Sequence, residues 1–232
     1  MRTEAPAPTR SATLGRRLRS VLVAPAAGFE AAISAADRRA RSGESLAEGL
    51  TPYVLSIVGG SSLMIGWLKI GGLLGGRDVD PTQFGFAELV FALVTGAALA
   101  MLGQAVFGVV APPVARAFGG GMPGRDARIV WGAAAFPQVF TVLILLPLDL
   151  IIVGPEIFAT TKPGDSIATG WASISIALGL LMAVWSVSLF ARGVQVVAQL
   201  GLLRAIGAVV VAATCLSLVI VAGSLILLSV WG

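Results

Sequence analysis

The sequence contains no histidine, and cysteine occurs only once, as Cys215. Without histidine, Ser-His-Asp triads and histidine-containing zinc sites are excluded, and a single cysteine cannot form an intrachain disulfide. The serines of the apolar run 171–191 have no histidine or lysine at the same depth to activate them. We therefore expect a protein that is not an enzyme and has no cofactor or metal.

Charged residues are also scarce, at 12% of the chain against 56% hydrophobic residues. A soluble domain carries about 25% charged residues, so too little polar surface exists here to cover a globule in water. The hydrophobic residues concentrate in five runs, each long enough to cross a bilayer: 52–74, 84–111, 129–153, 171–191 and 202–231. Because the runs do not alternate as barrel strands do, we predict an all-α bundle of five transmembrane helices over residues 51–232.

Residues 1–50 differ from the rest of the chain in being rich in arginine. Leu14, Leu18 and Val21 recur at helical spacing with arginines mostly on the other side, which predicts an amphipathic helix on an anionic membrane surface. Pro25 ends this helix, and a second amphipathic helix carrying Phe29 is expected to follow. The proline-containing start of the region is expected to be disordered.

Basic residues outside the apolar runs are unevenly distributed between the two sides. One side holds the N-terminal arginines, then Arg116, Arg125 and Arg128, then Arg192 and Arg204. The other side holds Arg77 and Lys162 among acidic residues. By the positive-inside rule, the N-terminus is cytoplasmic and the C-terminus lies on the opposite side. The abundance of alanine, glycine and arginine is typical of a bacterial protein, which places the chain in the cytoplasmic (inner) membrane.

The loop between the second and third runs combines glycines with basic residues: Arg116, Gly119, Gly120, Gly121, Arg125 and Arg128. No Gly-Lys-Ser/Thr follows the glycines, so the loop is not predicted to bind nucleotide phosphates. Its arginines are expected to contact anionic lipid headgroups or a partner protein. No basic patch with interleaved aromatics occurs, so nucleic acid is not an expected partner.

Three ionisable residues lie within the predicted spans: Lys69, Glu88 and Asp149. All three fall at a similar depth near the outer boundary, where charges are costly and mark pairing or function. Lys69 could pair with Glu88, Asp149 or both and so join the first three helices. The alternatives are that each side chain extends to the interface, or that the three form an ion or proton pathway.

Two glutamines form a second polar set within the spans. Gln104 and Gln138 are at similar depths on the cytoplasmic half, where amides can hold helices together or line a polar pocket. Pro137 removes a backbone donor and predicts a kink, and Gln138 could satisfy the carbonyl that is freed near Ala133. Small residues, among them Gly60 and Gly96, predict close helix packing.

Several of these features resemble the Yip-domain (Ypt-interacting-protein-like) family of membrane proteins. They are Pro25 and Phe29 in the N-terminal region, the five runs, the glycines before the third run, Pro137 within it and Trp171 at the start of the fourth. The resemblance implies a five-span fold with a cytoplasmic N-terminus. Eukaryotic members bind Rab-type GTPases, but their tyrosine-glycine signatures are missing here, where Tyr53 is the only tyrosine. A Rab-type partner is therefore not expected.

The pattern as a whole predicts a non-enzymatic membrane scaffold that binds a protein partner, a second copy of itself or anionic lipid. The alternative is a transporter or channel subunit for a small solute or ion that uses Lys69, Glu88 and Asp149. A row of polar residues down one helix face would favour transport, and no such row is evident in the sequence.

Overall fold

The computed structural model describes residues 14–42, 46–74, 86–158 and 166–231. Within these ranges every regular element is helical, which confirms the all-α class. The elements are α1 (Leu14–Val23), α2 (Pro25–Ser42), α3 (Leu46–Leu74), α4 (Phe86–Ala117), α5 (Gly124–Ala134), α6 (Pro137–Phe140), the π-helical η1 (Thr141–Leu145), α7 (Leu146–Ile152), the 3-10 turn η2 (Gly154–Phe158), α8 (Ser166–Val197) and α9 (Leu202–Trp231). The residues expected to be disordered at the N-terminus lie outside the described ranges.

Four stretches are long and apolar enough to cross a membrane: Leu50–Ile70, Leu89–Ala117, Gly124–Ile152 and Ser166–Val197. They correspond to the first four predicted spans. The fifth predicted span lies on α9 (Leu202–Trp231), whose side chains are described only as far as Leu218. Several membrane-length helices are thus present, while the fifth crossing stays a prediction.

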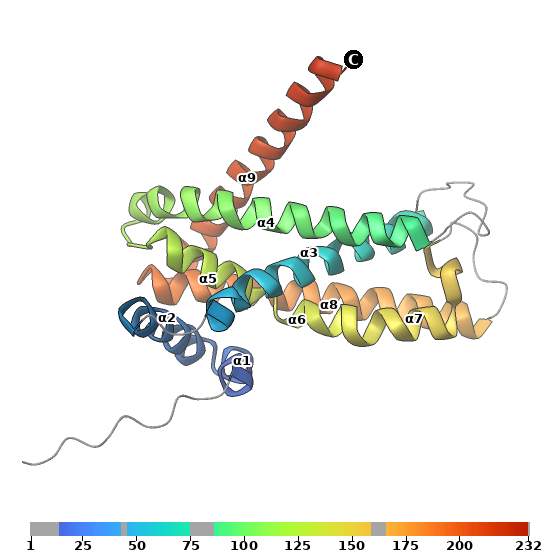
Figure 1. The fold of residues 1–232 in the computed structure, drawn as a ribbon, viewed down its shortest axis with the longest axis horizontal. Helices are drawn as coiled ribbons and strands as arrows, with labels where there is room; N and C mark the ends of the chain where they lie inside the picture. The colour runs from blue at the N-terminus through green and yellow to red at the C-terminus, as the bar shows by residue number, and fades with distance from the viewer. Residues whose placement is uncertain (1–13, 43–45, 75–85, 159–165, 232) are drawn as a thin grey trace, which may run out of the picture.

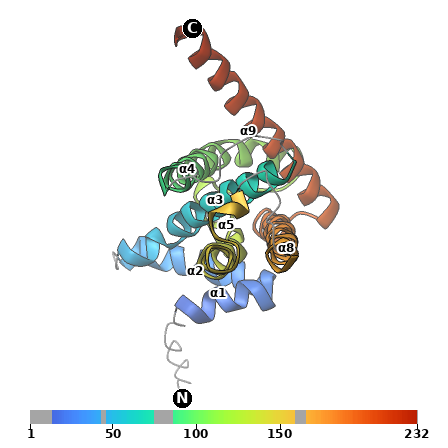
Figure 2. The ribbon, with the colours of Figure 1, turned by 90° about the vertical axis from the view of Figure 1, so that its right-hand side faces the viewer.

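The four long helical segments lie alongside one another in an elongated bundle (Figure 1). Helix α3 is central and contacts α4, α5, α6 and α8. Helix α9 starts beside α4 and α8 and then leaves the bundle at a steep angle, as both views show (Figures 1 and 2). We call the end with the Gly119–Gly121 turn the loop end and the end with η2 the far end.

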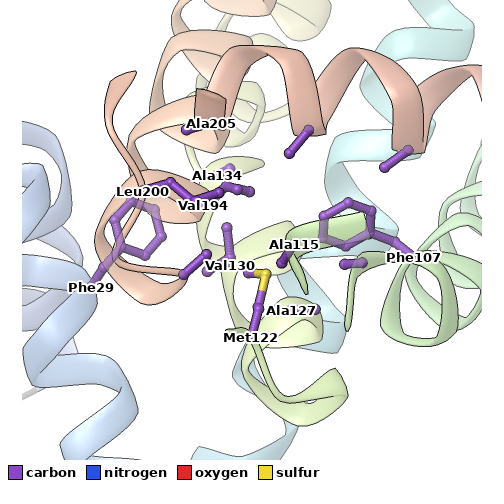
Figure 3. Packing of buried hydrophobic residues seen from close by; sticks show 14 of the residues in the cluster. Phe29, Phe107, Ala115, Met122, Ala127, Val130, Ala134, Val194, Leu200 and Ala205 are labelled. Atoms are coloured by element: carbon purple, nitrogen blue, oxygen red, sulfur yellow. The ribbon is translucent and has the colours of Figure 1, made fainter. Parts of the chain in front are cut away.

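Helices α1 and α2 pack against the loop end of the bundle (Figure 1). Val21 and Phe29 are buried in the same hydrophobic cluster as Val130 of α5 and Val194 of α8 (Figure 3). The apolar faces predicted from the sequence therefore exist, but these two side chains face the protein interior. The expectation that α1 rests its apolar face on lipid is wrong for Val21, because the bundle offers a closer apolar surface.

The second long helix does not end where its prolines stand. The second predicted run ends at Ala111, yet α4 continues through Pro112 and Pro113 to Ala117. Proline has a φ angle compatible with helix, so the chain can stay helical for another turn although two backbone donors are lost. The helix ends at Ala117, two residues before Gly119, whose φ is 87°.

The third long segment is interrupted directly before Pro137. Helix α5 ends at Ala134, and α6 begins at Pro137 after a turn at Ala135 and Phe136. A π-helical turn, Thr141–Leu145, follows within the same segment. Proline and π-bulges are ordinary causes of irregular helices, and this segment carries both between residues 135 and 145.

Two helices approach closely at Gly60 of α3 and Gly96 of α4. A Cβ atom added at Gly96 would overlap the carbonyl of Gly60 and lie 2.8 Å from the Cα atom of Ser61. Ser61 Oγ also donates to the carbonyl of Leu93 at 2.9 Å. The small residues thus let the two backbones meet, which is the packing mode of small-residue motifs in membranes.

We expect Gly96→Val to lower the free energy of unfolding by about 1–3 kcal/mol, the usual cost of overpacking a close contact. Thermal denaturation in detergent, followed by circular dichroism, measures the loss. The matched control is Gly66→Val on α3, because a Cβ at Gly66 meets no heavy atom within 4 Å. Equal losses in the two variants would contradict the close approach.

Candidate functional site

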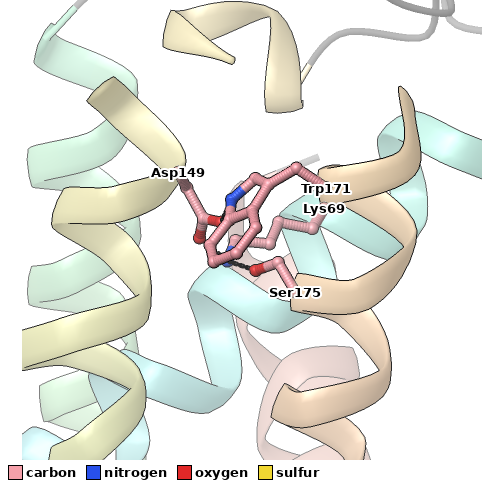
Figure 4. A network of polar contacts seen from close by, with 4 residues as sticks. All are labelled: Lys69, Asp149, Trp171 and Ser175. Carbon is pink, nitrogen blue, oxygen red and sulfur yellow. Dashed lines mark hydrogen bonds and ion pairs between the residues drawn. The ribbon is translucent and has the colours of Figure 1, made fainter. Parts of the chain in front are cut away.

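A buried ion pair lies toward the far end of the bundle and joins three helices. Lys69 of α3 and Asp149 of α7 have exposed fractions of 3% and 0% and form a salt bridge. Lys69 Nζ also donates to Ser175 Oγ of α8 at 3.2 Å, and Trp171 Nε1 of α8 donates to Asp149 Oδ1 at 2.9 Å (Figure 4). Both carboxylate oxygens therefore accept a hydrogen bond, and the ammonium group has two partners.

The structure thus brings together two of the three ionisable residues that the sequence placed at one depth. The side chain of the third, Glu88, lies outside the described residues. Trp171 and Ser175 were not predicted as partners of the pair. Their spacing of four residues, which puts them on one face of a helix, is the signal that could have found them. The expectation that the serines of the run 171–191 have no lysine at their depth is wrong for Ser175, which accepts from Lys69 Nζ, because α3 and α8 are in contact here.

Gln138 forms the next polar layer, nearer the middle of the bundle. Ser62 Oγ of α3 donates to Gln138 Oε1 at 2.7 Å, and Gln138 Nε2 donates to Ser186 Oγ of α8 at 3.4 Å. The carbonyl of Ala133 accepts instead from the backbone N–H of Phe136 at 3.2 Å. The expected role of Gln138 in capping that carbonyl is therefore wrong, because the turn before Pro137 supplies a backbone donor.

A third layer lies toward the loop end. Trp131 Nε1 of α5 donates to Ser56 Oγ of α3 at 3.0 Å, and Ser56 Oγ donates to the carbonyl of Ala100 of α4 at 3.3 Å. Gln104 Nε2 donates to the carbonyl of Arg128 at 3.0 Å. Among the described residues, Gln104 Oε1 is buried without a hydrogen-bond partner. Gln104 and Gln138 each join helices, but they do not bond to each other.

These layers lie at three levels along α3, where Ser56, Ser62 and Lys69 are all buried. At a rise of 1.5 Å per residue they extend over about 20 Å, or two thirds of a hydrocarbon core of about 30 Å. Ser62 and Lys69 are seven residues apart and share a face of the helix, whereas Ser56, six residues before Ser62, is turned by about 120°. The three side chains therefore do not form a row down one face of α3.

A groove with a volume of about 400 Å³ lies beside the second and third layers, which contain Gln138 and Ser56. It is lined by residues of α3, α4, α5, α6 and α8, with Leu216 of α9 at its edge. Ser56, Trp131, Gln138 and Ser186 contribute its polar atoms, and its other lining residues are apolar. Lys69 and Asp149 do not line it.

The three glycines of the loop have different roles. Gly119 has a positive φ of 87°, which favours glycine at the end of a helix. Gly120 lies so close to the carbonyl of Ala198 that a Cβ would overlap it. The backbone N–H of Gly121 donates to that same carbonyl at 3.2 Å. The run therefore ties the α4–α5 turn to the α8–α9 turn.

The arginines of this loop lie in different environments. Arg116 is exposed, and Arg125 is 44% exposed and forms an ion pair with Asp126 at 3.3 Å. Arg128 is half-buried, and its Nε atom has no hydrogen-bond partner within the described ranges. The loop thus presents Arg116 and Arg125 outward, while Arg128 lies against Gly108 of α4.

The residues that carry the family resemblance also have structural roles. Pro25 is the first residue of α2, a position that tolerates its missing N–H. Phe29 is fully buried, with Val130 and Gly193 beside its ring, and Trp171 bonds to Asp149. These roles explain why such residues stand where they do without assigning a function.

Comparison of the chain with models of protein families, with curated proteins and with solved structures found no match. The resemblance to Yip-domain proteins therefore stays a prediction.

Proposed function

We propose that the protein is a non-enzymatic scaffold of the bacterial inner membrane, built as a five-span bundle of the Yip-like type. Its N-terminus and its loop end are cytoplasmic, and this end binds a protein partner beside anionic lipid headgroups. The observation that carries the proposal is the set of exposed arginines at the loop end: Arg19, Arg116, Arg125, Arg192 and Arg204. They come from α1, α4, α5, α8 and α9, which the fold gathers at one end.

Two further features support a scaffold. Helices α1 and α2 are packed onto the bundle, so the loop end is a continuous surface rather than separate loops. In the interior, both members of the ion pair have partners within the protein, and the described groove does not reach them. An ion pair whose members are satisfied within the protein suits a structural role.

Partner capture tests this proposal. Chemical crosslinking in native membranes, followed by affinity purification, should recover a specific partner with the wild-type chain. A variant with Arg116→Gln, Arg125→Gln and Arg204→Gln should lose most of the capture, because these changes remove exposed charge without touching the core. The control replaces the same arginines by lysine, which keeps the charge and should retain the partner. Equal capture by the glutamine and lysine variants would contradict the proposal.

One observation favours a second candidate, a transporter or channel subunit. Buried polar side chains lie at three levels of α3, and the last level pairs a lysine with a carboxylate, residue types that mark proton and ion pathways in membranes. Proton flux into proteoliposomes, driven by a membrane potential and followed with a pH-sensitive dye, separates the two functions. The scaffold predicts no flux above that of empty liposomes. Flux that Ser62→Ala reduces would favour transport instead.

A further inference from the structure

The groove beside Gln138 and Ser186 contains hydrogen-bond donors that the protein does not use. The amide of Gln138 has two N–H donors, and its nitrogen has one acceptor among the described residues, Ser186 Oγ at 3.4 Å. Ser186 accepts that bond, and within the described ranges its own hydroxyl hydrogen has no acceptor. Ser188 on the same helix instead donates to the carbonyl four residues earlier. Both Gln138 and Ser186 line the groove.

The acceptors of the groove, in contrast, are already in use. Gln138 Oε1 accepts from Ser62, and Ser56 Oγ accepts from Trp131 Nε1 while donating to a backbone carbonyl. The polar side of the groove therefore offers hydrogen-bond donors to a ligand, while its own acceptors are already occupied. Its complement is a group that only accepts, such as a carbonyl oxygen.

An aromatic wall stands next to these donors. Trp131 and Phe190 both line the groove, with ring centroids 5.6 Å apart and planes nearly perpendicular. Phe107 backs both rings, at 5.5 Å from Trp131 and 4.8 Å from Phe190. Rings held in this way present a fixed flat surface, on which another flat ring can stack or pack edge to face.

The rim of the groove is made of exposed apolar side chains, namely Leu63, Trp67, Leu99 and Val187. It lies within the membrane-length stretches of α3, α4 and α8, so it faces lipid. The volume of about 400 Å³ is within the range of small-molecule sites, which is about 300–1,000 Å³. A ligand reaches this site through the bilayer, and its remaining apolar part can stay in the lipid.

We propose that the groove binds a membrane-soluble molecule with a flat ring, a carbonyl oxygen on that ring and an apolar tail, which is the chemistry of a quinone. The carbonyl accepts from Gln138 Nε2 and Ser186 Oγ, and the ring packs against Trp131 and Phe190. The tail leaves over the rim into lipid. A phospholipid headgroup does not suit the site, because none of the groove residues is charged. This site is separate from the arginines of the loop end and does not depend on the scaffold function.

Tryptophan fluorescence in proteoliposomes tests the site with decyl-substituted 1,4-benzoquinone as the probe. Quinones quench tryptophan on contact, so an occupied groove gives quenching that saturates, whereas random encounters in lipid give quenching that rises linearly. We expect saturation with the wild-type protein. Gln138→Leu should weaken the apparent affinity about tenfold, the size expected for one hydrogen bond. Ser186→Ala, a milder change at the same site, should weaken it severalfold.

Gln195→Leu is the matched control, because it makes the same replacement on α8 outside the groove and should bind as the wild type does. Decylbenzene, which has the tail and a ring but no carbonyl, should fail to compete. Linear quenching with the wild-type protein would overturn the proposal. So would equal affinity of the Gln138→Leu, Ser186→Ala and wild-type proteins, or competition by decylbenzene, since either result describes a crevice filled by any apolar chain. Circular dichroism of each variant confirms that the bundle is intact.

Discussion

Replacing Lys69 by methionine should lower the free energy of unfolding by about 3–5 kcal/mol, the cost of leaving one member of a buried ion pair alone. Asp149 would keep its hydrogen bond from Trp171 but would lose the positive charge that neutralises its carboxylate. The exposed fraction of Asp149 is 0%, so solvent does not compensate for this loss. Methionine keeps most of the length of lysine, so the loss reports the charge rather than a cavity. Unfolding by a denaturing detergent, followed by circular dichroism, measures the difference.

The double variant Lys69→Met with Asp149→Leu shows whether the pair itself is the cause. Because it removes both charges and leaves apolar groups of similar size, we expect it to regain most of the stability lost by either single variant. Additive losses in the double variant would contradict the pairing. Ser173→Ala is the control, because this serine is exposed on α8 and bonds only to a carbonyl of its own helix, Thr169 O.

The length and apolar content of the spans could be predicted because they depend on the bilayer alone. A helix must be long and apolar to cross lipid, whatever its neighbours are. The predicted runs 52–74, 84–111 and 171–191 therefore fall on α3, α4 and α8, with ends that differ by up to six residues. Where boundaries differ, as at Ala117 of α4, the chain continued beyond the apolar run into the turn that packs on the α8–α9 connection.

The contacts between helices were harder to predict because they depend on how each helix is rotated. Equal depth was enough to suggest that Lys69 and Asp149 meet. It could not reveal that Trp171 and Ser175 complete the site, since their faces are set by the packing of α8. The same holds for Ser56 and Ser62, whose partners on α4, α5 and α6 appear only once α3 is placed at the centre of the bundle.

The glycine run between α4 and α5 could be predicted only in part from the sequence. A positive φ at a helix end is a local requirement, so a glycine near position 119 was predictable. Gly120 is needed because the carbonyl of Ala198 lies against it, and Ala198 is far along the chain. No local pattern records that contact. The contact explains a second glycine beyond the one that the turn needs, whereas a Cβ atom at Gly121 would meet no heavy atom within 4 Å.

The second large effect is expected at Phe29, the side chain that holds the N-terminal helices on the bundle. Phe29 is fully buried, and a Cβ added at Gly193 of α8 would lie 2.9 Å from its ring. Phe29→Ala should cost about 3–5 kcal/mol, as is usual when a buried aromatic ring is removed. The substitution should weaken the packing of α1 and α2 against the bundle, since α3 to α9 keep their own contacts.

Limited proteolysis by trypsin separates this local loss from global unfolding. In Phe29→Ala we expect faster cleavage at the arginines of α1 and α2, while circular dichroism shows that the membrane helices persist. Gly193→Val should have the same effect from the other side of the contact, because its added methyl groups displace the ring. Phe91→Ala serves as the control, since this phenylalanine is 68% exposed on α4 and its removal leaves the N-terminal helices untouched. If both Phe29→Ala and Gly193→Val are cut as slowly as the control, α1 and α2 are held by contacts other than this ring, and the continuous loop-end surface on which the scaffold proposal rests would lose its anchor.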